Sequence, residues 1–125
     1  MGTRADFYTR SLNGNLSWRG SIAWDGGEEL PTYIREAGTA GAFVHGLYKW
    51  FKHDRQDATT PKQGWPWPWD TSAMTDYAYV YDAETGKVRK YQFGKLMGRG
   101  SAPRWPDMSA VKQVTFGSRS GILVF

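Results

Sequence analysis

The pattern of residues 76–93 constrains the fold more than any other part of the chain. Three tyrosines alternate with small apolar residues over 76–82, which is the two-residue period of a strand with one face buried. The run Ala-Glu-Thr-Gly at 83–86 has the composition of a turn, and 87–93 then alternates again. We therefore predict a β-hairpin, one face of which carries Tyr77, Tyr79 and Tyr81.

A second hairpin is predicted at the start of the chain. Residues 5–9 read as a strand, Asn13-Gly14 suits a turn that needs positive φ, and 16–24 continues as the returning strand. The returning strand has four apolar residues of one parity, which predicts that they share a face: Leu16, Trp18, Ile22 and Trp24. Gly20 lies among them and indicates a bulge or a close backbone approach.

Two consecutive helices are predicted between the hairpins. The first covers about 30–37, where four apolar residues recur at helical spacing: Leu30, Tyr33, Ile34 and Ala37. Gly38 is placed to end it, and Thr39 can cap a second helix over about 40–53. The second helix has an apolar stripe of Phe43, Leu47, Trp50 and Phe51, and its polar side carries Lys49, Lys52 and His53.

These elements predict one α+β domain over 1–125. We expect an antiparallel sheet of two hairpins plus a C-terminal strand near 121–125, packed against the two consecutive helices. Two long irregular segments, 54–72 and 94–108, complete the chain. Loops of this length in a compact domain are usually functional or ordered by their own packing.

Composition excludes several classes of protein. The chain has no cysteine, so it has no disulfide, no thiolate nucleophile and no Cys-based zinc site. No stretch approaches the ~20 apolar residues that cross a bilayer. The first ten residues carry charges and no apolar run, so we expect no signal peptide. The expectation is a cytoplasmic protein without a membrane partner.

Charge is distributed unevenly along the chain, whose net charge is +4. Residues 1–86 contain eight Lys/Arg and eleven Asp/Glu, whereas 87–125 contain eight basic residues and only Asp107 as an acid. A basic third of a domain can indicate an anionic partner. It can equally be a solvated face whose neighbours in space are the acids of the first part.

Catalytic and metal sites are not indicated by any motif. The only histidines, His45 and His53, are eight residues apart, and local spacing does not supply the three or four ligands that a metal site needs. Ser, His and Asp are scattered without a nucleophile motif. We therefore predict a protein that is not an enzyme, with no catalytic residues, no metal and no cofactor.

The most distinctive stretch is GWPWPWD at 64–70. Its two prolines remove backbone donors, so it is not a central strand. If it is extended, its tryptophan rings share one face and form a platform for a ligand. If it is polyproline II, the rings point in different directions and close a core. Its place before a tyrosine-rich strand favours core cover for at least two of Trp65, Trp67 and Trp69.

Two further features suit an anionic partner. In GRGSAPR at 98–104, the glycines allow close backbone approach and Arg99 and Arg104 can grip an anion, although a flexible basic loop explains the same residues. The tyrosine strand beside basic residues is suited to stacking and phosphate contact, with Tyr77 and Tyr79 as candidates. Tyrosines at strand parity also suit a half-buried sheet.

The chain resembles a known family through four stretches: MGTRADFY at 1–8, GSIAWDG at 20–26, GWPWPWDTSAMTDYAYVYD at 64–82, and WPDMSAVKQVTFGSRSGILVF at 105–125. The family consists of small uncharacterised bacterial proteins from phages, prophages and other mobile elements. The resemblance implies no particular site residues. It implies a context in which small proteins often inhibit host machinery, as anti-CRISPR proteins do.

The sequence thus leads to two main hypotheses of function, beside a third in which an enzyme has an unrecognised site around the Asp- and Tyr-rich strand. The first is a binding protein that inhibits a host protein or protein–nucleic-acid complex, with Trp65, Trp67, Trp69, Arg99 and Arg104 as anchors, because Trp and Arg are common in binding hot spots. The alternative is a nucleic-acid or nucleotide binding protein that uses the tyrosine strand and the basic C-terminal third. The sequence does not indicate an oligomeric state.

Overall fold

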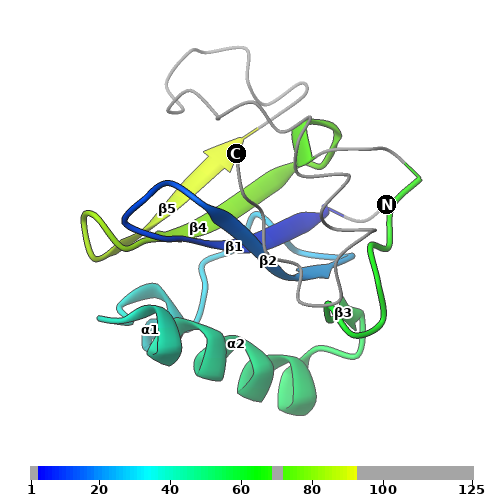
Figure 1. The fold of residues 1–125 in the computed structure, drawn as a ribbon. Coiled ribbons are helices and arrows are strands. Elements are labelled where there is room, and N and C mark those ends of the chain that lie inside the picture. The colour runs from blue at the N-terminus through cyan, green and yellow to red at the C-terminus, as the bar shows by residue number, and fades with distance from the viewer. Residues whose placement is uncertain (1–2, 69–71, 93–125) are drawn as a thin grey trace.

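The computed structural model describes residues 3–68 and 72–92, which form an α+β fold (Figure 1). The remaining residues, among them the predicted C-terminal strand and the loop 94–108, lie outside the described part of the chain. The elements in chain order are β1 (Ala5–Arg10), β2 (Leu16–Ile22), α1 (Thr32–Arg35), α2 (Ala40–Asp54), β3 (Ala58–Thr59), the 3-10 turn η1 (Ser72–Met74), β4 (Tyr77–Asp82) and β5 (Lys87–Gln92).

The five strands form one mixed sheet in the order β3-β2-β1-β4-β5. Both predicted hairpins are present, since β1 pairs with β2 and β4 with β5 in antiparallel fashion. The prediction of a purely antiparallel sheet is wrong, because β1 and β4 are parallel, with Ala5 opposite Tyr77 and Arg10 opposite Asp82. The physical reason is that β1 is buried on both faces and so takes the centre of the sheet. The helical crossover then brings β4 alongside it in the same direction.

A bulge at Arg19 and Gly20 divides β2 into two halves with opposite facing. Phe7 is opposite Gly20, but the next residue, Tyr8, is opposite Trp18, so one residue of β2 is extra. The predicted bulge is therefore confirmed. The prediction that all four apolar residues of this strand share one face is wrong, because Leu16 and Trp18 pack on the side away from the helices, whereas Ile22 packs on the helix side and Trp24 is exposed.

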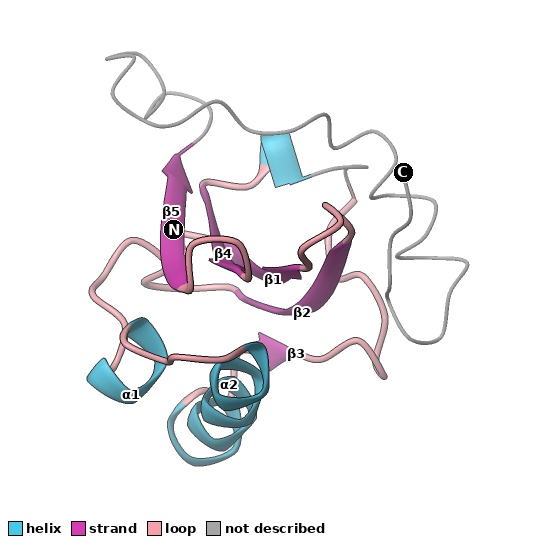
Figure 2. Cartoon of the chain, turned by 60° about the vertical axis from the view of Figure 1, so that its left-hand side comes forward, coloured by secondary structure: helices cyan, strands magenta, loops and turns pink. Residues whose placement is uncertain are grey.

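Helix α2 forms as predicted, and the hydroxyl Oγ1 of Thr39 caps it by accepting the N–H of Ala42 at 3.0 Å. The first predicted helix is only the single turn α1. The chain leaves it at Glu36 and is extended again at Thr39, the residue directly before α2. Figure 2 shows both helices on one face of the sheet.

The sheet has an apolar cluster on each face. On the helix side, the ring of Phe7 stacks on Tyr79 at 5.3 Å and meets Phe51 edge-on at 5.8 Å. The predicted common facing of Tyr77, Tyr79 and Tyr81 is confirmed, because all three lie in this cluster. The opposite cluster consists of Tyr8, Leu16, Trp18, Trp65, Ala78, Val80 and Tyr91. Neither described helix has the length and apolar character that crossing a membrane requires.

Candidate functional site

The Trp-Pro segment lies against the sheet face opposite the helices. Trp65 is only 7% exposed, and its ring meets that of Trp18 edge-on at 5.3 Å. Trp67 is partly buried and packs on the same cluster, and the guanidinium of Arg4 lies 5.9 Å from the centre of its ring. Trp65 is thus a core residue, and Trp67 lies at the boundary of the core.

Trp67 is attached to a buried carboxylate. Its indole Nε1–H donates to Oδ1 of Asp6 at 2.6 Å, and the hydroxyl of Ser21 donates to the same oxygen at 2.5 Å. The other carboxylate oxygen, Oδ2, accepts from the hydroxyl of Ser72 at 2.5 Å. Asp6 is completely buried, as the second residue of β1. These contacts connect β1, β2, the Trp-Pro segment and η1 through one side chain.

Two further donors surround this carboxylate network. Because Ser72 gives its proton to Asp6, the hydroxyl of Tyr8 is the donor in its 2.6 Å hydrogen bond with Ser72. The indole of Trp18 donates to Ser21 at 3.1 Å. Burial raises the pKa of Asp6, while the side-chain hydrogen bonds it accepts partly offset this increase. Burial also raises the pKa of Tyr8, and the neighbouring charge of Asp6 adds to the rise.

A buried acid with a raised pKa is a feature of many active sites, so Asp6 is a natural candidate for acid–base chemistry. Its geometry suits a structural tie better. Both carboxylate oxygens accept hydrogen bonds from side chains of the protein, and none of its surface is exposed. A substrate would contact Asp6 only after Trp67 or a serine had moved. Asp6 was not predicted as a functional residue, because nothing in the residue pattern of β1 distinguishes it from an outward-facing acid.

The other predicted binding residues are not brought together with the Trp-Pro segment. Tyr77 and Tyr79 lie on the opposite face of the sheet, in the helix-side core, with Lys90 Nζ at 4.5 and 5.8 Å from their ring centres. The hydroxyl of Tyr79 donates to the carbonyl of Gly26 at 2.6 Å, and burial raises its pKa. These rings have no exposed face on which a base could stack. Trp69, Arg99 and Arg104 lie outside the described residues.

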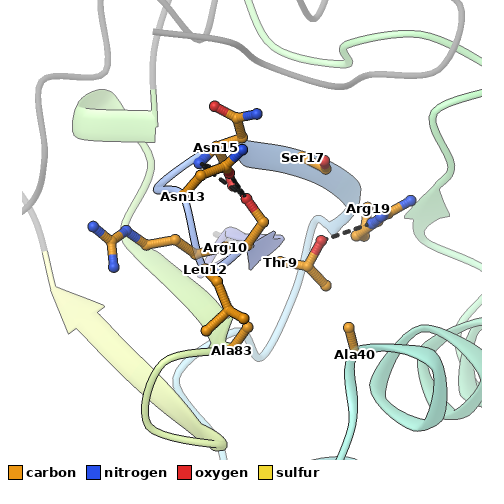
Figure 3. Close-up of a pocket in the computed structure, with 10 residues that line it drawn as sticks. Thr9, Arg10, Leu12, Asn13, Asn15, Ser17, Arg19, Ala40 and Ala83 are labelled. Carbon is orange, nitrogen blue, oxygen red and sulfur yellow. Dashed lines mark hydrogen bonds between the residues drawn. The ribbon is translucent and has the colours of Figure 1, made fainter.

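A hollow of about 590 Å3 lies beside the tip of the first hairpin (Figure 3). The guanidinium of Arg10 is paired with Asp82 at 3.6 Å and with Glu84 at 3.9 Å, and Arg19 Nε donates to the hydroxyl of Thr9 at 3.0 Å. Apart from these two arginines, the residues that line the hollow are uncharged: Thr9, Ser11, Leu12, Asn13, Asn15, Ser17, Ala40 and Ala83. Two acids balance the charge of Arg10, so Arg19 is the lining cation that forms no ion pair with the other described residues.

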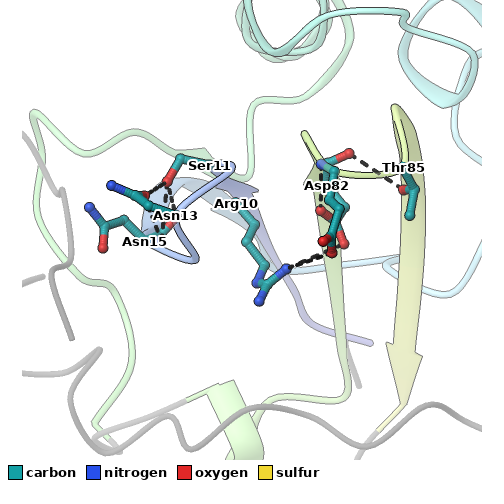
Figure 4. Close-up of polar contacts among 7 residues, drawn as sticks. Arg10, Ser11, Asn13, Asn15, Asp82 and Thr85 are labelled. Carbon is teal, nitrogen blue, oxygen red and sulfur yellow. Dashed lines mark hydrogen bonds and ion pairs between the residues drawn. The ribbon is translucent and has the colours of Figure 1, made fainter.

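The two turns beside this hollow are held by their own side chains (Figure 4). In the first, the hydroxyl of Ser11 bonds to the side chain of Asn13 and accepts the N–H of Asn15 at 3.1 Å. In the second, the carboxylate of Asp82 accepts the N–H of Glu84 at 2.9 Å. The polar groups are therefore used in forming the turns, and a structural role accounts for them.

The outer face of α2 is different, because its polar side chains form no hydrogen bond or ion pair with the other described residues. Five exposed or nearly exposed side chains follow one another at helical spacing and line a shallow hollow of about 410 Å3: His45, Tyr48, Lys49, Lys52 and His53. We call these five residues the basic stripe. The inner face of the same helix carries Phe43, Leu47 and Phe51, all of them buried.

The basic stripe carries no acidic side chain. Among the described residues, no acid forms an ion pair with any of its four basic side chains. The ring of Tyr33 from α1 is 46% exposed and lies 5.5 Å from Lys49 Nζ. Burial raises the pKa of Tyr48, and the positive charge of Arg19 nearby partly offsets the rise. The sequence contained one signal of this surface, namely that residues 40–53 include no acid.

The described residues contain no group of three or more His, Asp or Glu side chains placed to hold a metal ion. Comparison of the chain with protein-family models, with curated proteins and with solved structures gave no match.

Proposed function

We propose that the protein is a non-enzymatic binding protein of phage or mobile-element origin that acts in the host cytoplasm. In this proposal it inhibits or modulates a host macromolecular system, in the manner of an anti-CRISPR inhibitor. The observation that carries the proposal is the basic stripe. It is an ordered surface of two lysines, two histidines and a tyrosine on the outer face of α2.

The helix that carries the stripe is firmly anchored. Its inner face is buried against the sheet, where Phe43 lies 5.9 Å from Tyr81 and Phe51 lies 5.8 Å from Phe7, measured between ring centres. Its N-terminus is capped by Thr39. A partner therefore meets a surface whose backbone is already ordered, so that little conformational entropy is lost on binding.

Two of the predicted binding residues, Trp65 and Trp67, have structural roles and are therefore less suited to testing the proposal. Trp65 supports the core, and Trp67 holds Asp6, so substitution of either would disturb the fold as well as any interface. Trp69, Arg99 and Arg104 stay predictions. The outer face of α2 is the better place to test binding, because its side chains can be changed without opening the core.

The proposal is tested with a bacterial strain that carries an active CRISPR–Cas system and is challenged with a targeted plasmid. The wild-type protein is expected to raise transformation. The double variant Lys49→Gln/Lys52→Gln is expected to lose most of this effect. A matched control, Lys62→Gln/Lys87→Gln, removes two exposed charges away from α2 and should retain it.

The non-enzymatic part of the proposal has its own measurement. Purified protein is titrated into the affected host complex at two concentrations of that complex. A binding inhibitor should reach half-inhibition at a concentration that rises with the amount of target, independent of incubation time. Complete inactivation by a small fraction of one equivalent, growing with time, would show an enzyme instead.

A further inference from the structure

We infer that the basic stripe binds the phosphate backbone of a nucleic acid. This inference rests on the proposed function in so far as both use the outer face of α2. It names the chemistry of the partner there, which for a host protein–nucleic-acid complex is its nucleic-acid component. The nucleic-acid surface inferred here is the exposed stripe, whereas the strand of Tyr77 and Tyr79 predicted from the sequence is buried.

Charge is the first argument. Solvated helix faces ordinarily mix the two signs, because Glu–Lys pairs three or four residues apart stabilise a helix. The stripe has four basic side chains from His45 to His53 and no acid between them. Asp54, the only acid of α2, follows the stripe at the end of the helix. A surface of one sign is less favourable for the isolated helix and favourable for an anionic partner.

Dimensions are the second argument. From His45 to His53 the helix rises by about 12 Å, at ~1.5 Å per residue. One strand of a duplex carries a phosphate every ~3.4 Å along its axis, so about three or four phosphates lie within that length. Lys49 and Lys52 can each contact one of these phosphates, and imidazole N–H groups of His45 and His53 can donate hydrogen bonds to others. Figures 1 and 2 show that α2 lies on the outer side of the molecule, with the sheet behind its inner face.

The residue types favour a nucleic acid over an acidic protein. Protein–protein interfaces concentrate apolar side chains at their centre and are depleted in lysine, whereas protein–nucleic-acid interfaces are strongly positive. The stripe has two lysines at its centre and no aliphatic side chain. The exposed rings of Tyr48 and of neighbouring Tyr33 can pack on sugars or on unpaired bases beside the phosphates.

The experiment measures the affinity of the full chain for a fluorescent duplex DNA of mixed sequence, by anisotropy, over salt from about 50 to 200 mM. The wild-type protein should bind with an affinity that falls steeply with salt. In Lys49→Gln/Lys52→Gln, loss of two phosphate contacts should make the slope of log affinity against log salt shallower by about 1.8. The control Lys62→Gln/Lys87→Gln has the same net charge and should keep the wild-type slope. Circular dichroism checks that all three proteins are folded.

Several results would overturn the inference. One is the absence of binding at the lowest salt. A second is an equal change of slope in both double variants, which would show a response to net charge alone. A third is displacement of the DNA by polyglutamate at the same charge concentration, which would indicate an acidic polypeptide as the partner.

The two proposals can fail separately. If the stripe variant loses inhibition of the CRISPR–Cas system but keeps its DNA affinity and salt slope, the proposed function stands and this inference falls. If the variant loses DNA affinity but inhibits as the wild type does, the nucleic-acid surface stands and the use of α2 in inhibition falls.

Discussion

The indole Nε1–H of Trp67 donates a 2.6 Å hydrogen bond to Oδ1 of Asp6, sixty-one residues earlier in the chain. Asp6 belongs to the central strand, whereas Trp67 lies between two prolines in a segment without regular structure. The bond thus ties the irregular segment to the centre of the sheet. The described part of the Trp-Pro motif therefore has a structural role. Trp65 fills the core, and Trp67 donates a hydrogen bond to the buried carboxylate of Asp6.

Replacement of Trp67 by Phe keeps an aromatic ring but removes the donor. Hydrogen bonds to charged groups contribute about 1.5 to 3 kcal/mol, so the free energy of unfolding should fall by about that amount. Urea denaturation at neutral pH measures the change. The matched control is Trp24→Phe, at a side chain that is 59% exposed, where a change within about 0.5 kcal/mol is expected. Equal effects in the two variants would show that the bond to Asp6 is not what matters.

The raised pKa of Asp6 predicts a pH dependence of stability. A carboxyl whose pKa is higher in the folded state than its ordinary value of 3.8 binds more protons folded than unfolded, so its contribution to stability improves as pH falls. The variant Asp6→Asn lacks this titration. The difference in unfolding free energy between wild type and variant should therefore shift in favour of the wild type as pH falls from 7 toward 4. The same difference at every pH would contradict the raised pKa.

Local patterns in the sequence predicted the parts of the fold that depend on local chemistry. Asn13-Gly14 and the run 83–86 specify the two hairpins, Gly20 specifies the bulge, and Thr39 specifies the start of α2. Each of these depends on backbone conformation within a few residues. Such preferences can be recognised from residue types alone.

The long-range features were not predictable in the same way. The parallel pairing of β1 with β4 depends on which strand takes the centre of the sheet, and turn residues carry no information on that. The bulge moves Ile22 to the opposite face from Trp18, so a parity argument across it fails. The role of Asp6 depends on donors from Ser21, Ser72 and Trp67, which meet only in the folded chain.

Substitution by alanine is expected to have opposite effects on stability at Gly20 and Gly38. Gly20 has φ of +144°, and a Cβ there would lie 2.6 Å from Cε2 of Phe51 and 2.9 Å from the carbonyl oxygen of Thr59. Gly20→Ala should therefore destabilise the protein by about 1 to 3 kcal/mol. A Cβ at Gly38 meets nothing within 4 Å, so Gly38→Ala should be neutral or stabilising by up to about 1 kcal/mol. Thermal unfolding measures both, and destabilisation by Gly38→Ala as large as that by Gly20→Ala would contradict the close approach at the bulge.

The side chain of Asp57, in the segment after α2, is bonded to the end of β2, and we expect this contact to be lost in acid. Oδ2 of Asp57 accepts the N–H groups of Ala23 and Trp24 at 2.9 Å each and lies 2.7 Å from Nη2 of Arg55. Burial alone would raise the pKa of Asp57, but the hydrogen bonds and charge of Arg55 and the N–H of Trp24 together lower it. Asp57→Asn removes the closer of the two acids beside the largely buried Arg55 and leaves only the exposed Asp25, at 4.0 Å. The free energy of unfolding should therefore fall by about 2 to 3 kcal/mol at neutral pH.

The pH dependence separates this charge pair from a simple loss of packing at Asp57. A carboxyl with a lowered pKa stabilises the folded state above its ordinary value of 3.8, and this contribution is lost as pH falls through the folded-state pKa. The advantage of the wild type over Asp57→Asn should thus be constant near neutral pH and shrink below about 3.8. The control Asp54→Asn changes an exposed acid three residues away and should leave neutral-pH stability within about 0.5 kcal/mol of the wild type. A wild-type advantage that is constant down to the acid transition would mean that the charge of Asp57 does not stabilise Arg55.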